Sequence, residues 1–180
     1  MSALKQSALL ICLAAGLSLL SQHAVASTSA HGHRHAHGEA EVELAVDSSG
    51  RISGRLQGAM DGFLPFEHAP KTEAQRQQVR ELQQKLTRVD WILTVNPDAQ
   101  CVQESVRAES SLFQGQDQSG HASLTVDFSL VCARPAQLYS LTFGVLGHSK
   151  RLKKIELEFV GPKGQAKAVL NTRKNQFILP

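Results

Sequence analysis

The sequence has few aromatic residues and lacks the motifs that mark common enzymes and nucleic-acid-binding proteins. Aromatic side chains make up 5% of the 180 residues and do not alternate with basic ones, and the net charge is only +3, so no nucleic-acid surface is expected. The chain contains no G-x-S-x-G, no H-E-x-x-H and no phosphate-binding glycine loop. Ser, His and Asp are present, but no spacing among them singles out a catalytic triad. We therefore expect a protein that is not an enzyme, and an undiscovered hydrolase is the weakest alternative.

Long apolar runs are also scarce. The one near the start, Ala8 to Leu20, is about 13 residues long, whereas a membrane-spanning helix needs roughly 20. Lys5 precedes this run and Ala24-Val25-Ala26 follows it, which is the pattern of a cleavable secretory signal. Cys12 lies deep in the run after the bulky Ile11, which argues against a lipidated cysteine. We expect cleavage after Ala26, a periplasmic protein, and no membrane span in the mature chain.

Cysteine is scarce as well: of three in the chain, only Cys101 and Cys132 follow the expected cleavage site. In an oxidising compartment, two cysteines most simply form one disulfide. Closing a loop of about 32 residues would stabilise the fold by roughly 3–4 kcal/mol. The alternative is a thiol metal site or a redox pair, which the absence of a C-x-x-C arrangement disfavours.

The mature chain begins with a polar stretch and then takes on the two-residue period of strands. Residues 27–38 contain no large apolar side chain and are expected to form a flexible, His-rich tail. Residues 41–46 and 51–58 alternate around the turn Asp47-Ser48-Ser49-Gly50, which predicts a β-hairpin. Residues 61–70 hold two prolines and are expected to form a loop. The apolar residues that would pin this loop to the core are Phe63, Leu64 and Phe66.

One helix is expected after this loop. Thr72 and Gln75 form a T-x-x-Q capping pattern, and apolar residues then recur at helical spacing towards an uncertain end near Trp91. The members of this stripe are Val79, Leu82, Leu86, Val89 and Leu93. Strand patterns return later, near residues 101–109, 122–132, 138–145, 152–160 and 165–170. We predict an α+β fold, mainly an antiparallel sheet or sandwich of about seven strands with one packed helix and one disulfide. The expected organisation is a signal peptide at 1–26, a tail at 27–38 and a single domain at 39–180.

The disulfide raises a question of register. If strand 101–109 pairs directly with strand 122–132, Cys101 and Cys132 lie opposite each other and point to the same face. Regular alternation then places a polar set opposite an apolar set: Gln103, Ser105 and Arg107 against Leu130, Phe128 and Val126. Either Cys101 precedes its strand, or the bridge joins elements that are not direct neighbours.

Histidines at alternate positions are the strongest chemical signal. His31, His33, His35 and His37 occupy every second position of the expected tail. Imidazole binds zinc, copper and nickel near neutral pH, and small residues between the rings hinder their convergence little. We interpret the tract as a labile metal-binding segment. The alternative is a solvated linker.

The remaining histidines of the mature chain are isolated. His68 follows Glu67 in the Pro/Phe loop, where the pair would either bind metal or cap the next helix. His121 opens the strand that ends at Cys132 and is a second candidate ligand. His148 stands beside Lys150 and Arg151, whose charges would oppose a cation.

Several segments together resemble a known family. These are His37-Gly38 before the acidic strand to Val46, the motif Phe66-Glu67-His68-Ala69-Pro70-Lys71-Thr72, the two spaced cysteines, and the turn before Gln165. They resemble the ZrgA-like group of small periplasmic proteins. That resemblance implies zinc binding in support of uptake by an ABC transporter. One feature departs from the family: residues 109–120, between the cysteines, lack the long His/Asp tract of zinc-binding relatives. Arg can also replace His68 in the family, which suits a structural role for that residue.

We therefore expect a periplasmic accessory protein that binds zinc labilely, with copper or nickel as possible alternatives, and passes it to a transporter or buffers it. The candidate metal ligands are His31, His33, His35, His37, His68 and His121. The alternative function is a non-catalytic envelope interaction module in which the His tail is incidental.

Overall fold

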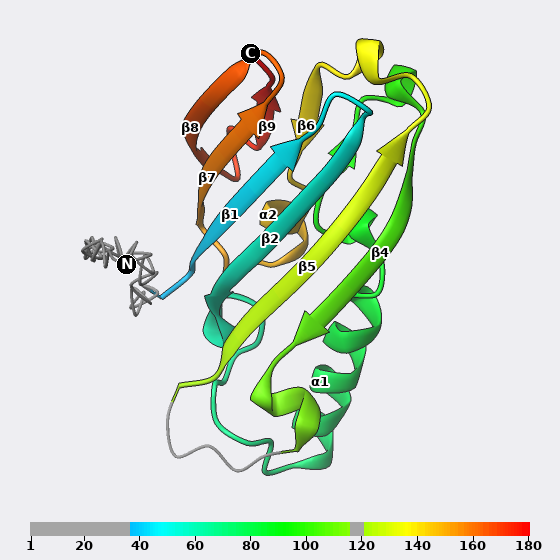
Figure 1. The fold of residues 1–180 in the computed structure, drawn as a ribbon. Coiled ribbons are helices and arrows are strands. Elements are labelled where there is room, and N and C mark those ends of the chain that lie inside the picture. The colour runs from blue at the N-terminus through cyan, green and yellow to red at the C-terminus, as the bar shows by residue number, and fades with distance from the viewer. Residues whose placement is uncertain (1–36, 116–120) are drawn as a thin grey trace, which may run out of the picture. The chain divides into compact units, whose positions relative to one another are not determined.

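The computed structural model describes residues 37–115 and 121–180, which form two β-sheets of nine strands in total. The larger sheet has the order β4-β5-β2-β1-β7-β8 (Figure 1). The smaller sheet has the order β3-β6-β9. The strands of the larger sheet are β1 Glu39–Val46, β2 Arg51–Ala59, β4 Cys101–Glu109, β5 Ser123–Cys132, β7 Lys154–Gly161 and β8 Gly164–Asn171. The fold is thus mainly β with one main helix, as predicted, but it has nine strands where about seven were expected.

Strands β1 and β2 form the predicted hairpin. Asp47 caps the turn: its Oδ1 accepts hydrogen bonds from the backbone N–H of Ser49 (2.8 Å) and of Arg51 (3.0 Å). Gly50 has a φ of +86°, which a residue with a side chain rarely adopts. In the hairpin, Val42 pairs with Leu56, and both are buried. The alternation read from the sequence therefore assigns the correct face to the core.

One pairing departs from the antiparallel scheme. Strand β7 pairs with β1 in parallel, with Val42 opposite Leu157 and Leu44 opposite Phe159. Parallel neighbours require a crossover connection, and here the whole chain between the hairpin and β7 supplies it. Apolar and polar residues alternate along β7 whether the strand runs parallel or antiparallel to its neighbour, so the sequence pattern does not reveal its orientation. Strand β8 then returns antiparallel to β7 through the predicted turn at Gly161–Gly164.

A β-bulge resolves the register of the disulfide. Cys101 and Cys132 are bonded, and they lie directly opposite each other in the pair β4–β5. The register shifts between Gln103 and Ser105, so Glu104 is the extra residue of the bulge. Beyond the bulge, Val106 pairs with Phe128 and Ala108 with Val126. Both expected arrangements were therefore wrong, because the bulge lets directly paired strands share a disulfide and still turn their apolar side chains inward.

Helix α1 spans Glu73–Lys85 and begins with the predicted capping box. The Thr72 hydroxyl accepts from the Gln75 N–H, and the Gln75 side chain accepts from the Thr72 N–H, both at 3.2 Å. The helix ends at Lys85, earlier than the sequence pattern suggested. The last three residues of the apolar stripe are buried, but they lie beyond the helix: Leu86, Val89 and Leu93. The Gln103 side chain holds this exit, because its Oε1 accepts from the Val89 N–H at 2.8 Å.

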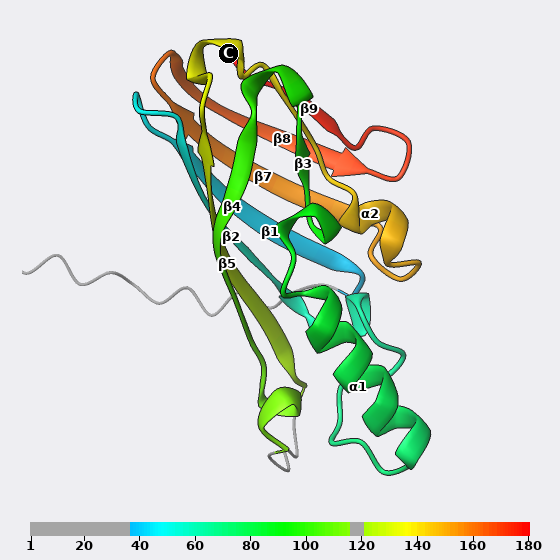
Figure 2. The same ribbon diagram turned by 90° about the vertical axis from the view of Figure 1, so that its right-hand side faces the viewer.

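The smaller sheet and the helices lie on one face of the larger sheet, and no helix or strand of the described residues covers the other face (Figure 2). The smaller sheet consists of β3 Thr94–Val95, β6 Ser140–Thr142 and β9 Gln176–Ile178. The strand expected at 138–145 is reduced to β6, and a short helix, α2 Val145–His148, follows it. Strands β3 and β9 were not predicted, because strands of two or three residues are too short to show an alternation.

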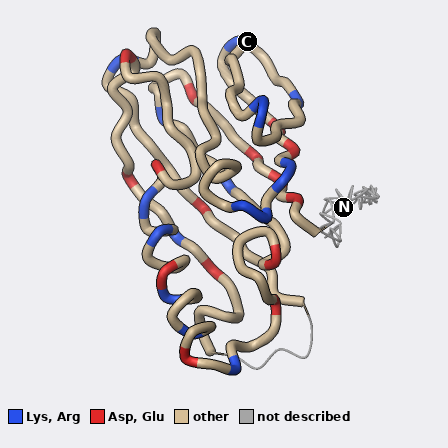
Figure 3. The backbone as a smooth tube through the Cα atoms, turned by 180° about the vertical axis from the view of Figure 1, so that it is seen from behind, with Lys and Arg blue, Asp and Glu red and all other residues tan. Residues whose placement is uncertain are grey.

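Charged residues of both signs are interspersed along the described chain (Figure 3). On helix α1, for example, Arg80 bonds to Glu73 at 2.7 Å. Within the described ranges, no helix is both long and apolar enough to cross a membrane.

Candidate metal centre

A buried turn at the end of β2 supplies the first residue of the site. Asp61 lies in a 3₁₀ turn, Met60–Gly62, that follows β2 directly. Three hydrogen bonds fix the turn to distant parts of the chain. Arg151 Nε donates to the Asp61 carbonyl at 2.6 Å, and the Ser149 hydroxyl donates to the Gly62 carbonyl. The Met60 N–H donates to the Ala122 carbonyl at 2.8 Å. The Asp61 side chain is thereby fixed below the surface.

The loop that follows supplies Glu67. Phe66 is buried in the core, as predicted, and it anchors the backbone beside Glu67. The Ala122 N–H donates to the Glu67 carbonyl at 3.3 Å, so the residue just before β5 binds both the loop and the turn of Asp61. The Glu67 side chain is only 12% exposed, and that of Asp61 is 11% exposed. Two carboxylates thus form the floor of the site.

His37, two residues before β1, supplies the first imidazole. Next to it, Gly38 has a φ of +72° and its carbonyl accepts from the Lys153 N–H at 2.7 Å. A Cβ at this position would lie 2.8 Å from the Arg151 carbonyl oxygen, a contact that real structures avoid. His37 and Gly38, at the end of the expected tail, therefore contact the folded domain directly.

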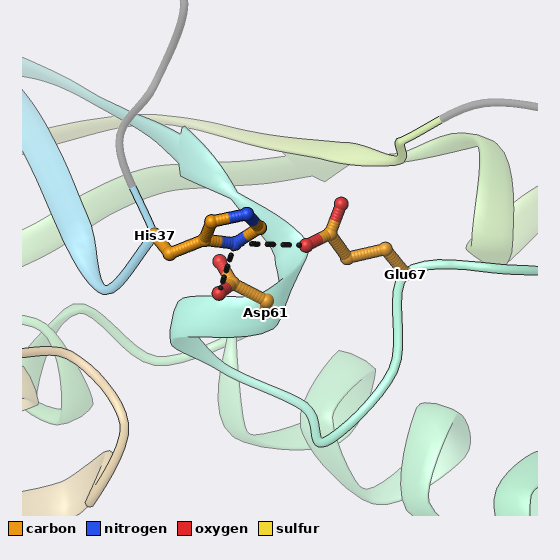
Figure 4. A group of neighbouring side chains, drawn as sticks. All are labelled: His37, Asp61 and Glu67. Carbon is orange, nitrogen blue, oxygen red and sulfur yellow. Dashed lines mark hydrogen bonds and ion pairs between the residues drawn. The ribbon is translucent and has the colours of Figure 1, made fainter.

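The imidazole of His37 lies between the carboxylates of Asp61 and Glu67, and its Nδ1 is directed towards both (Figure 4). Its Nδ1 donates to Asp61 Oδ2 at 2.7 Å and is 3.4 Å from Glu67 Oε1. The hydrogen bond to Asp61 raises the pKa of His37 above its ordinary value, and the charges of Asp61 and Glu67 raise it further. The site therefore favours positive charge at this position.

A second imidazole comes from His121, two residues before β5. Its Nδ1 bonds to the other oxygen of Glu67, Oε2. The rings of His37 and His121 meet edge to face, with centroids 6.1 Å apart. Their side chains are 73% and 82% exposed, respectively. The cluster thus combines two little-exposed carboxylates, which offer oxygen ligands, with two exposed imidazoles, which offer nitrogen ligands.

This donor set fits a divalent metal ion. Ligand atoms of His37, Asp61 and Glu67 lie within 4.8 Å of one another, and no other such group occurs among residues 37–115 and 121–180. In the same ranges, Asp61 Oδ1 is the one buried side-chain oxygen or nitrogen without a hydrogen-bond partner. An unpaired buried oxygen is costly, and a bound cation would satisfy it. Imidazole nitrogen and carboxylate oxygen are both established zinc ligands.

The structure brings together some of the histidines predicted from sequence and separates others. His37 and His121 meet in the cluster, whereas the His68 Nδ1 donates to the Ala69 carbonyl at 2.8 Å and its ring stacks on Phe66. His31, His33 and His35 lie outside the described residues. From the sequence, Glu67 was considered only as the neighbour of His68 and not as a partner of His37 or His121.

Asp61 was missed altogether. The signal that was available was its position directly after the alternating pattern of β2. Such a position leaves a polar residue at the edge of the core.

Comparison with known proteins agrees with this chemistry. The profile of a family described as ZrgA family zinc uptake protein matches residues 34–179. The matched segment contains all four residues of the cluster. No curated protein matched the chain.

Proposed function

The chain belongs to the ZrgA family of zinc uptake proteins, and from this premise we propose that it binds zinc as cargo through His37, Asp61 and Glu67. His121, whose Nδ1 bonds to Glu67, would be the fourth ligand. The observation that carries the proposal is a pair of little-exposed carboxylates, one with an unpaired buried oxygen, which bond to two exposed imidazoles. Asp61 and Glu67 would supply the negative charge, and His37 and His121 would complete a four-ligand set of the kind that zinc prefers.

The arrangement suits transient binding rather than permanent storage. A structural zinc site is closed on all sides, whereas here the two imidazoles are exposed. Exposed ligands can be displaced one at a time by a competing ligand from a partner. We propose that the protein delivers zinc to the periplasmic face of an ABC-type transporter and catalyses no reaction itself.

An extracytoplasmic location fits the disulfide and the family, because disulfides persist in oxidising compartments. The secretory signal at residues 1–26 and its cleavage after Ala26 remain predictions.

A zinc titration of the oxidised protein by calorimetry tests the proposal. With His31, His33 and His35 changed to Asn in every protein compared, so that the tract adds no second site, we expect one saturable site that is lost or weakened at least about 100-fold by D61N/E67Q, because even indirect supports of a metal site contribute 10- to 100-fold. The matched control is E73Q/D90N, which also removes one glutamate and one aspartate charge. Both residues form exposed ion pairs with arginine and lie outside the cluster. This control should bind zinc as the unaltered protein does.

Two results would contradict the proposal. One is equal loss of binding in D61N/E67Q and in the control, which would indicate an unspecific charge effect. The other is the absence of zinc binding in the unaltered protein, which would favour an interaction module. The titration is repeated with copper, because imidazole sites generally bind copper more tightly than zinc.

A further inference from the structure

We propose that the loop between α2 and β7 is a docking surface for an acidic protein that accepts zinc from the carboxylate-lined site. This basic loop comprises residues 149–153 and contains Lys150, Arg151 and Lys153. The inference rests on the proposed delivery of zinc from that site. It adds the surface through which the partner is recognised and the charge that the partner must carry.

The first argument is that the cations of the basic loop have no acidic partners. All three side chains are exposed, and among the described residues none of them forms an ion pair with a carboxylate. Arg151 and Lys153 bond instead to the neutral backbone carbonyls of Asp61 and Lys150. The next basic residue, Lys154, differs because it bonds to two glutamates, at 2.8 and 3.0 Å. The loop therefore keeps a positive charge that an anionic partner can compensate.

The second argument is that hydrogen bonds fix the basic loop beside the site. Arg151 Nε donates to the Asp61 carbonyl at 2.6 Å, and the Lys153 N–H donates to the Gly38 carbonyl at 2.7 Å, directly after His37. A Cβ at Gly38 would lie 3.6 Å from Lys153 Cγ, so the side chain of Lys153 also lies beside this junction. The basic loop thus borders the site next to His37.

The third argument is the direction from which an acceptor must approach. The carboxylates of Asp61 and Glu67 are only 11% and 12% exposed, whereas the ring of His37 is 73% exposed. An acceptor would therefore reach a bound ion from the side of the imidazoles. The exposed cations beside His37 then lie within the surface that the acceptor contacts.

The fourth argument is the chemistry of zinc acceptors. Protein zinc sites are built from thiolates, carboxylates and imidazoles, so an empty acceptor site that contains either of the first two is anionic. Such an acceptor is attracted to the basic loop before transfer. Once it holds zinc, two of its negative charges are neutralised and the attraction weakens. Electrostatics would thus favour the arrival of the empty acceptor and the departure of the loaded one.

The test compares zinc transfer to two synthetic acceptors that differ in charge. Each is a peptide with four histidines and a zinc-responsive fluorophore, and the histidines are flanked by six glutamates in one peptide and by six glutamines in the other. Zinc-loaded, oxidised protein is mixed with excess peptide in a stopped-flow instrument, which gives the bimolecular rate constant. All proteins compared carry H31N/H33N/H35N, so that zinc leaves only the proposed site.

The variant K150Q/K153Q removes two of the three cations and leaves Arg151, which supports the turn of Asp61. We expect its rate constant with the glutamate peptide to fall by about fivefold or more at about 10 mM salt, because charge steering raises association rates by 10-fold or more. The difference should vanish at about 1 M salt, where the Debye length is about 3 Å. With the glutamine peptide, the rate constant should change by less than about twofold.

The matched control R134Q/K163Q also removes two exposed cations that form no ion pair with a described carboxylate. Arg134 lies beyond the end of β5, and Lys163 lies in the turn after β7. The strand pairing places both at the end of the larger sheet opposite the site. This control should transfer zinc to both peptides at the unaltered rate.

Equal slowing with both peptides in K150Q/K153Q would overturn the docking surface, because the lysines would then act on the zinc site rather than on the partner. Equal slowing in the control would also overturn it, since net charge alone would explain the effect. An unchanged rate with the glutamate peptide would do the same. If this variant then lost binding to phosphatidylglycerol vesicles, the loop would instead serve a membrane surface. Failure of the proposed zinc site shows separately, as undiminished zinc binding by D61N/E67Q.

Discussion

The four described histidines form two pairs with different surroundings. In the cluster, the Nδ1 atoms of His37 and His121 face the carboxylates of Asp61 and Glu67. Outside it, His68 and His148 use Nδ1 to bond the backbone carbonyls of Ala69 and Trp91, at 2.8 and 2.9 Å. Their rings stack on Phe66 and Trp91, with centroids 5.6 and 5.7 Å apart.

All four side chains are exposed, so exposure does not distinguish the pairs. What distinguishes them is the atom opposite Nδ1. A carboxylate is an anion that binds a proton or a metal ion, whereas a backbone carbonyl is neutral and here serves to orient the ring. The comparison therefore supports the first pair as ligands of the proposed metal site and assigns the second pair to local packing.

The largest expected effect comes from removing the disulfide. This change tests whether zinc binding by His37 and His121 depends on the stability of the whole sheet. The change C101A/C132A should lower the free energy of unfolding by about 3–4 kcal/mol, for a sequence separation of 31 residues. The folded protein should still bind zinc with an affinity within about twofold, because the cluster lies at the other end of β5 and contains no thiol. Urea denaturation and a zinc titration measure the two quantities. A large loss of zinc affinity in the folded variant would break the comparison, since the cysteines would then belong to the site.

The next effect sharpens the comparison directly. Replacing both cluster imidazoles, in H37N/H121N, should weaken zinc binding by about 100-fold, because two of four ligands are lost. Replacing the other pair, in H68N/H148N, should change the affinity by less than about twofold. Competition with a chromophoric chelator measures both. If the two double variants lose equal affinity, the distinction between the pairs is wrong.

The smallest effect is that of pH. Asp61 and Glu67 raise the pKa of His37, and zinc competes with the proton for this imidazole. Zinc binding is therefore complete above the raised pKa and is lost as the pH falls through it, by about tenfold per pH unit for each proton displaced. Affinities measured between about pH 8 and pH 5.5 give the slope. H37N should show a shallower slope, and an identical slope would mean that another group binds the competing proton.

Much of the fold could be predicted from the sequence, because the relevant signals are local. The two-residue alternation identified the β1–β2 hairpin, and Thr72 with Gln75 marked the start of α1. The end of α1 was missed because Val89 and Leu93 continue the apolar spacing in a segment that is no longer helical. The parallel pairing of β7 and the bulge at Glu104 depend on neighbours that are distant in the chain.

The candidate site could be predicted only in part, for the same reason. His37 and His121 were candidates because imidazole is a recognisable ligand wherever it stands in a sequence. Asp61 and Glu67 become candidate ligands only through the fold, which places them beside each other and leaves their side chains little exposed. His68 follows Glu67 directly in sequence, yet its ring lies against Phe66 rather than in the cluster.

The most direct test of the central claim is anomalous X-ray diffraction at the zinc absorption edge, from crystals of the oxidised protein grown with one equivalent of zinc. The account predicts an anomalous peak about 2.0–2.2 Å from ligand atoms of Asp61 and Glu67, with the imidazoles of His37 and His121 completing the site. A zinc peak elsewhere, with no peak between these carboxylates, would contradict it.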